Sequence, residues 1–438
     1  MKKGIIVSLI AALLLSTILG AVPAAVLVAS AGESTTFRHC EHPRDHRLGM
    51  GNSTSNGLLN WRYTARGDVI SSLTVANKIV YIGSWNGSVY ALNATTGTKI
   101  WSFTTGNPTS YCFPTVANGI VYVGSNNSNV YALNAVTGAK VWSFTTENST
   151  FFRSPTVANG IVYVGGGNKN VYALNATTGA KIWNYTISGY VWSDPTVANG
   201  IVYVGSNDNN TYALNATTGA KIWNYTTGDL SSHPTIANGI FYIGSWDGNV
   251  YALDANTGVK VWSYNTEESR VLSPPTVING IAYVGSEDAN IYALDAKTGE
   301  KVWTYATGDF ISTSTVVTNG IVYANSNGGN VYALNARTGV KVWNYTATVW
   351  NDTTGAGNLM TCMPVVANGI VCIANWGGNV YALNATTGIQ MWSYATGGAV
   401  QLNPTITNGI VYVGSRDNNI YALNANTGSK LWNYTTGD

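Results

Sequence analysis

The dodecapeptide YALNATTGAKIW occupies residues 172–183 and recurs without change at residues 212–223. Near-copies follow one another along the chain, and each ends in a tryptophan four residues after a glycine. A period of about 40 residues is typical of solenoids and of propeller blades. Aligned on the Tyr-Ala-Leu triplet, the nine copies lie 39–41 residues apart, with one interval of 49 residues, and begin at Tyr90, Tyr131, Tyr172, Tyr212, Tyr251, Tyr292, Tyr332, Tyr381 and Tyr421.

One repeat unit, residues 195–227, shows how each copy is organised. Short apolar segments at 195–199, 201–206, 211–216 and 222–227 alternate with turn sequences rich in Asn, Gly and Thr. Such segments predict strands joined by tight turns, and none of them has helical periodicity. Four short antiparallel strands repeated about nine times predict an all-β protein, a β-propeller of four-stranded blades.

The repeated dodecapeptide also predicts how neighbouring blades pack. Each unit has the spacing Ala-x-Asn/Asp-x-x-Thr-Gly-x-x-x-Trp, as in Ala173, Gly179 and Trp183. The small Ala and Gly leave room for an indole from a neighbouring blade, and burial of that indole stabilises the contact. The predicted docking residues are Trp101, Trp142, Trp183, Trp223, Trp262, Trp303, Trp343, Trp392 and Trp432.

This spacing resembles the tryptophan-docking motif of the PQQ-type, quinoprotein-like β-propeller repeat family, over roughly residues 58–438. That family includes PQQ-dependent alcohol dehydrogenases and the lipoprotein of the bacterial outer-membrane assembly machine, so the resemblance implies fold far more than function. The family usually closes with eight blades, whereas nine units are present here, and Trp61 begins a tenth tryptophan segment. We therefore expect eight or nine blades, with the mode of ring closure open.

The N-terminal segment has the features of an export signal. Lys2 and Lys3 precede an apolar stretch over residues 4–29, and Ala29-Ser30-Ala31 fits a cleavage site. We expect a signal peptide over residues 1–31, with a retained membrane anchor as the alternative. A polar, His-rich lead-in over residues 32–57 and a single propeller domain over residues 58–438 follow. The stretch FRHCEHPRDHRLG at residues 37–49 is similar to the lead-in of secreted archaeal members, which implies an extracellular or cell-surface protein.

Composition excludes one class of partner. The net charge is +2, only 10% of residues are charged, and no basic run alternates with aromatic residues. Because phosphate binding needs a concentrated positive surface, nucleic acid is not an expected partner.

Differences among the copies mark positions that the repeated framework does not fix. They concentrate just before the first strand of each blade and in the turn between the second and third strands, which in an up-and-down blade lie on one face. We call this face the variable rim, and the opposite face, with its nearly invariant turns, the uniform face. Aromatic residues gathered on one surface are typical of a binding site. The predicted partner-binding residues of the rim are Trp85, Trp246, Trp376, Tyr111, Phe113, Phe151, Phe152, Arg153, Tyr190, Trp192, His233, Arg270 and Phe310.

An alternative assigns some rim residues to packing. Trp85, Trp246 and Trp376 can pack against neighbouring loops instead of a partner. Residues beside the innermost strands can fill the channel, which is the expected role of Leu73, Leu272 and Met363.

The sequence lacks the features of an active site. A PQQ dehydrogenase is expected to have a calcium site and, in many members, a disulfide between adjacent cysteines, whereas the four cysteines here are all separated. We therefore expect no catalytic residue and no cofactor. His39, Cys40, His42 and His46 form a weak metal candidate, but their spacing does not match a closed zinc site, and a polar lead-in that packs on the ring is the favoured explanation.

Many Asn-x-Ser/Thr triplets are present, although turn chemistry also favours Asn and Thr at several of them. The candidate glycosylation sites are Asn93, Asn175, Asn184, Asn215, Asn224, Asn344 and Asn384. Together these features predict a non-catalytic extracellular or cell-surface scaffold that binds a protein or an envelope polysaccharide through the aromatic rim, in contact with a membrane only through an N-terminal anchor. The alternatives are a PQQ- or metal-dependent oxidoreductase at the channel mouth and a structural surface-layer component.

Overall fold

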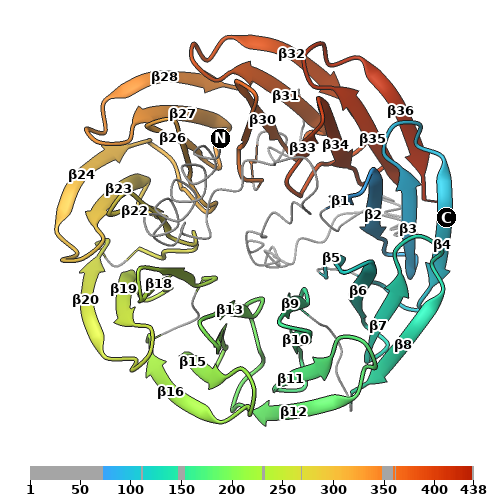
Figure 1. Cartoon of the computed structure of the whole chain (residues 1–438). Coiled ribbons are helices and arrows are strands. Elements are labelled where there is room, and N and C mark those ends of the chain that lie inside the picture. Colours follow the sequence, from blue (N-terminus) through green and yellow to red (C-terminus); the bar gives the residue numbers. More distant parts are fainter. Residues whose placement is uncertain are drawn as a thin grey trace, which may run out of the picture.

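Nine four-stranded antiparallel sheets follow one another around a ring (Figure 1). The structure is a computed structural model that describes residues 73–109, 112–146, 153–228, 232–267, 269–347, 359–360 and 362–436. All regular elements within these ranges are β-strands. The predicted all-β propeller is thus confirmed, and of the two expected blade numbers nine is correct. The predicted signal, the His-rich lead-in and Trp61 lie outside the described residues.

Each blade consists of four consecutive strands, ordered from the channel to the outer edge. Blade 1 contains β1 (Thr74–Ala76), β2 (Ile79–Gly83), β3 (Ser88–Asn93) and β4 (Lys99–Thr104), and blade 2 contains β5 (Thr115–Ala117), β6 (Ile120–Ser125), β7 (Asn129–Asn134) and β8 (Lys140–Thr145). Blade 3 contains β9 (Thr156–Ala158), β10 (Ile161–Gly165), β11 (Asn170–Asn175) and β12 (Lys181–Thr186), and blade 4 contains β13 (Thr196–Ala198), β14 (Ile201–Gly205), β15 (Asn210–Asn215) and β16 (Lys221–Thr226). Blade 5 contains β17 (Thr235–Ala237), β18 (Ile240–Gly244), β19 (Asn249–Asp254) and β20 (Lys260–Asn265), and blade 6 contains β21 (Thr276–Ile278), β22 (Ile281–Gly285), β23 (Asn290–Asp295) and β24 (Lys301–Ala306). Blade 7 contains β25 (Val316–Thr318), β26 (Ile321–Asn325), β27 (Asn330–Asn335) and β28 (Lys341–Thr346), blade 8 contains β29 (Val365–Ala367), β30 (Ile370–Ala374), β31 (Asn379–Asn384) and β32 (Gln390–Ala395), and blade 9 contains β33 (Thr405–Thr407), β34 (Ile410–Gly414), β35 (Asn419–Asn424) and β36 (Lys430–Thr435).

The tryptophan of each outermost strand docks on a neighbouring blade, as predicted, and the structure shows that this is the following blade. In blade 5 the indole nitrogen of Trp262 donates a hydrogen bond to the carbonyl oxygen of Ala296 in blade 6, at 3.0 Å. The ring lies against Gly299, where a Cβ atom would come within 2.6 Å of it. The hydroxyl of Tyr242 donates to the same carbonyl at 2.9 Å. The other eight docking tryptophans make the equivalent hydrogen bond, so the repeated dodecapeptide is the contact between blades.

The last blade closes the ring with its own four strands. Trp432 donates to the carbonyl oxygen of Ala94 in blade 1 at 3.2 Å, and Tyr412 donates to the same oxygen at 2.9 Å. The Trp432 ring packs against Gly97. Among the described residues, sheet β33–β36 lies beside sheet β1–β4 without exchanging a strand with it.

A second set of hydrogen bonds joins the innermost strands around the channel. The threonine that begins the first strand donates to the carbonyl oxygen just before the first strand of the next blade, as from Thr115 to Pro155 at 2.6 Å. The same bond crosses the closure, from Thr405 to Leu73 at 3.3 Å. Valine replaces this threonine in blades 7 and 8, at Val316 and Val365, so the inner bond is lost there.

Alkaline solution is expected to destabilise the ring. Five tyrosines that donate to the alanine carbonyl of the next blade have a pKa that burial raises to about 12: Tyr81, Tyr203, Tyr242, Tyr283 and Tyr412. Since the unfolded-state value is about 10, this stabilisation is complete below pH 10 and is lost as the pH rises towards 12. The midpoint temperature of thermal unfolding, followed by circular dichroism, should decrease as the pH is raised from 9 to 11. This interval extends about one pH unit on each side of the unfolded-state pKa. An unchanged midpoint over this interval would contradict the expectation.

Candidate functional site

Backbone hydrogen bonds place the segments before the first strands beside the turns between the second and third strands. Asn207 donates to the carbonyl oxygen of Tyr190 at 3.1 Å, and Asn327 donates to that of Phe310 at 2.8 Å. On the opposite side, the backbone nitrogen of Ala216, in the turn after β15, donates to the carbonyl oxygen of Gly200, in the turn after β13, at 2.9 Å. The two kinds of variable segment therefore share one face, the variable rim, and the invariant turns share the other.

Ten of the thirteen predicted rim residues lie within the described residues, and they differ in exposure. Phe310 and Tyr190 are 51% and 44% exposed, and Arg270 is also exposed. Trp85, Trp192 and Trp376 are half-buried. The expected exposure is wrong for the four buried residues, Phe113, Arg153, His233 and Trp246. Tyr111, Phe151 and Phe152 lie outside the described residues.

Contacts between neighbouring blades explain these burials. The guanidinium of Arg270, before blade 6, lies 4.9 Å from the ring centre of Trp246 in blade 5, and Arg153 lies 4.5 Å from that of Trp192. Both are cation–π contacts, which cover the indole faces. Phe113 packs with Leu402 of blade 9 and the half-buried Trp85 of blade 1. For Trp246 the packing alternative is therefore correct.

The residues expected to fill the channel also have defined places. Leu73 is buried in the core between blades 9 and 1. Leu272 is buried as well, and Met363 is half-buried.

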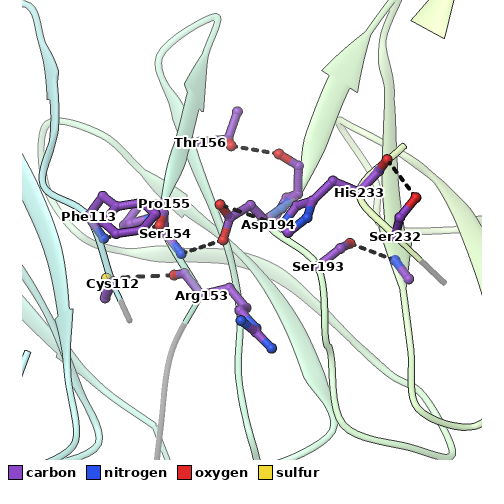
Figure 2. Close-up of polar contacts among 12 residues, drawn as sticks. Cys112, Phe113, Arg153, Ser154, Pro155, Thr156, Ser193, Asp194, Ser232 and His233 are labelled. Atoms are coloured by element: carbon purple, nitrogen blue, oxygen red, sulfur yellow. Dashed lines mark hydrogen bonds and ion pairs between the residues drawn. The ribbon is translucent and has the colours of Figure 1, made fainter. Parts of the chain in front are cut away.

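A row of polar contacts runs along the inner edge of blades 2–5 (Figure 2). The backbone nitrogen of Phe113 donates to Ser154 Oγ at 3.1 Å, and the nitrogen of Ser154 donates to Asp194 Oδ1 at 2.8 Å. Asp194 Oδ2 lies 3.8 Å from His233 Nε2. All four residues stand two positions before the first strand of their blade. Ser154 and Asp194 were not among the predicted partner-binding residues, although they share their position in the repeat with Phe113 and His233.

Ser232 and Cys112, which flank this row, are held by hydrogen bonds and are not activated as nucleophiles. Ser232 Oγ accepts from the nitrogen of Gly244 at 3.0 Å and lies 3.4 Å from the carbonyl oxygen of His233, so its proton points towards a carbonyl. Cys112 Sγ accepts from the nitrogen of Gly124 at 2.9 Å. Burial raises the pKa of the Cys112 thiol to about 12, so it stays protonated and unreactive at neutral pH.

The side chains that the structure describes do not fit a calcium and quinone site of the dehydrogenase type. Within the described residues, no three His, Cys, Asp or Glu side chains come close enough to hold a metal ion. The Asp194 carboxylate already faces Ser154 and His233. The weak metal candidates His39, Cys40, His42 and His46 lie outside the described residues. In the part of the chain that the structure describes, no helix has the length and apolar character needed to span a bilayer.

The candidate glycosylation sites fall into two structural groups. In the turns of the uniform face, asparagine uses its oxygen to cap the turn, as when Asn175 Oδ1 accepts from Thr177 and Thr178. On the outermost strands the attachment nitrogen itself donates, from Asn184 Nδ2 to Asn170 Oδ1 at 3.2 Å. The turn positions Asn93, Asn175, Asn215 and Asn384 therefore have a structural role whether or not they carry a sugar.

Comparison with known proteins was made for both sequence and structure. The model of the family described as outer membrane protein assembly factor BamB matches residues 50–127, 85–168, 126–233, 226–375 and 346–438. No curated protein has a significantly similar sequence.

Solved structures share the fold at low sequence identity. BamB from Moraxella catarrhalis is 21% identical with a TM-score of 0.56, over 69% of this chain and 93% of that one. The computationally designed Ika8 protein is 16% identical with a TM-score of 0.58, over 70% of this chain and 94% of that one. The quinohemoprotein alcohol dehydrogenase ADHIIG from Pseudomonas putida HK5 is 17% identical with a TM-score of 0.53, over 82% of this chain and 70% of that one. Because the family model matches nearly the whole propeller, the chain belongs to the family of outer membrane protein assembly factor BamB.

Proposed function

We propose that this protein is a non-catalytic scaffold, exported from the cytoplasm, that binds a protein partner through its variable rim. The family description, an assembly factor for other proteins, supports a protein partner. The described rim residues form packing and hydrogen-bonded contacts, and none has the arrangement of a nucleophile or a metal ligand set.

The observation that carries the proposal is the exposure of two large aromatic side chains on backbone that is held in place. Phe310 and Tyr190 are 51% and 44% exposed, although each residue's carbonyl oxygen is bound by the adjacent turn. Keeping an aromatic ring in water forfeits the free energy that its burial would give. Aromatic residues on rigid backbone lose little conformational entropy on binding and often dominate interfaces.

The test is binding of the protein to isolated envelopes of its own organism. The Tyr190→Ser/Phe310→Ser double variant is expected to bind about tenfold or more weakly, because it removes two side chains that anchor the interface. The matched control is Val302→Ser/Val342→Ser, which removes two side chains of 46% and 48% exposure from the outermost strands. Circular dichroism would show that both variants are folded.

Equal binding by the two double variants would contradict the proposal. Protease treatment of the envelopes distinguishes the two kinds of partner, because it removes a protein and leaves an envelope polysaccharide. Substitution of Trp85, Trp246 and Trp376 together is a poorer test, since Trp246 is buried and its loss would also destabilise the fold.

A further inference from the structure

Charged residues are divided unequally between the two faces of the propeller. Among the described residues, the uniform face and its edge hold eleven Lys and Arg side chains against three Asp and Glu, a net charge of +8. The variable rim holds four Lys and Arg against eight Asp and Glu, a net charge of −4. The overall charge near neutrality therefore conceals two faces of opposite sign.

The positive charge forms a ring. The first residue of the outermost strand, where the chain leaves the uniform face, is lysine in eight of the nine blades and Gln390 in blade 8. All eight lysines are exposed, and none of them forms an ion pair with another described residue. The eight residues are Lys99, Lys140, Lys181, Lys221, Lys260, Lys301, Lys341 and Lys430. Lys78, Lys297 and Arg337 complete the eleven.

Two of the three acidic residues of this face are bound within turns, and the third is the exposed Glu300. Asp254 and Asp295 cap turns, where their carboxylates accept hydrogen bonds from the backbone of Thr257 and Thr298. These bonds hold the pKa of both carboxyls below the usual value, so both stay charged at neutral pH and are included in the net charge of +8.

Aliphatic side chains project from the same face. Four turns between the third and fourth strands have a Val or Ile at the tip, and these side chains are 65–68% exposed, more than any other large hydrophobic side chain described. They are Val136 in blade 2, Val259 in blade 5, Val340 in blade 7 and Ile389 in blade 8. Each one lies within four residues of the first residue of its outermost strand.

We propose that the uniform face docks on the surface of an anionic lipid bilayer. A ring of exposed lysines at the edge of one face matches a flat surface of negative charge, and each lysine near such a surface adds to the attraction. The four aliphatic side chains belong to turns of the same face, where they can enter the boundary between headgroups and acyl chains. An acidic polysaccharide offers the charge but no apolar layer for these tips, so the bilayer accounts for both observations.

This docking is independent of the proposed function and leaves the variable rim directed away from the membrane. It is incompatible with sugars on the turn asparagines, because a glycan at Asn175 or Asn215 would stand between the turn and the lipid. Sugars found on these residues by mass spectrometry of the native protein would therefore overturn the inference.

The experiment is co-sedimentation of the full chain with phosphatidylcholine vesicles and with vesicles that also contain phosphatidylglycerol. We expect the anionic vesicles to bind the protein more tightly, with an advantage that falls as salt is added. Because any N-terminal anchor is present in every variant, the difference between the two vesicle types measures the contribution of the face.

Two charge-reversed variants test which face is responsible. Lys181→Glu/Lys221→Glu changes the uniform face, and Lys169→Glu/Arg416→Glu makes the same change in net charge on the variable rim. The first is expected to lose about tenfold or more of its preference for anionic vesicles, and the second much less. Equal losses would show attraction by net charge alone and would overturn the inference, as would equal binding of wild type to both vesicle types.

A third variant separates the lipid from other polyanions. Val136→Ser/Val259→Ser/Val340→Ser/Ile389→Ser keeps the lysine ring and removes the apolar tips. It should bind anionic vesicles more weakly than wild type at high salt, where the charge contribution is screened. If this variant binds as well as wild type, or if an acidic polysaccharide competes fully with the vesicles, the partner is a polyanion other than the bilayer.

Discussion

Trp262→Ala is expected to lower the free energy of unfolding by about 3–5 kcal/mol, the usual cost of removing a buried Trp side chain. The indole is only 7% exposed, packs on Gly299 and bonds the carbonyl oxygen of Ala296. Tyr242 continues to donate to that oxygen, so the cost arises mainly from the cavity between blades 5 and 6. Urea unfolding followed by circular dichroism would measure it.

The control for this substitution lies next to it on the same strand. Val261 is 46% exposed, and Val261→Ala should change the free energy of unfolding by no more than about 0.5 kcal/mol. If Trp262→Ala were as mild as Val261→Ala, docking of the indole would not be what joins the blades.

The second large effect is expected at the glycine that receives this indole. Gly299 has φ of 76°, in the left-handed region, and a Cβ atom there would lie 2.6 Å from the Trp262 ring. Gly299→Ala therefore combines backbone strain of about 1–2 kcal/mol with displacement of the indole, which costs about 1–3 kcal/mol more.

A second glycine separates these two contributions. Gly280 has φ of 78°, and no atom lies within 4 Å of the position where its Cβ would be. Gly280→Ala should show the backbone strain alone. The same urea titration of both variants gives the difference, and equal losses would mean that the indole can move aside without cost.

Sequence alone predicted the blades because each repeat contains its own strands, turns and docking residues. Ala173, Gly179 and Trp183 lie within eleven residues of one another. Each repeat therefore carries both the tryptophan that docks on the following blade and the glycine that receives the tryptophan of the preceding one. The number of blades could not be settled in this way. It depends on the angle between neighbouring blades, to which all nine contacts contribute, and no single repeat specifies that angle.

The rim was harder to predict because its contacts join residues that are distant in the sequence. Trp246 is covered by Arg270, which comes from the segment before the next blade. Asp194 and His233 meet although 39 residues separate them. Variability among the copies therefore located the rim, but it did not distinguish Phe310, which is exposed, from Phe113, which packs on Leu402.

The closure between blade 9 and blade 1 uses the contacts found between consecutive blades: an indole on a glycine, two donors on one alanine carbonyl and a threonine bond at the channel. None of the described strands is shared across it. A circularly permuted chain, cut between any two blades and joined across the present closure, would therefore keep every contact between blades. Architecture and chain connectivity are separable in this ring, which has nine equivalent places at which the polypeptide could begin.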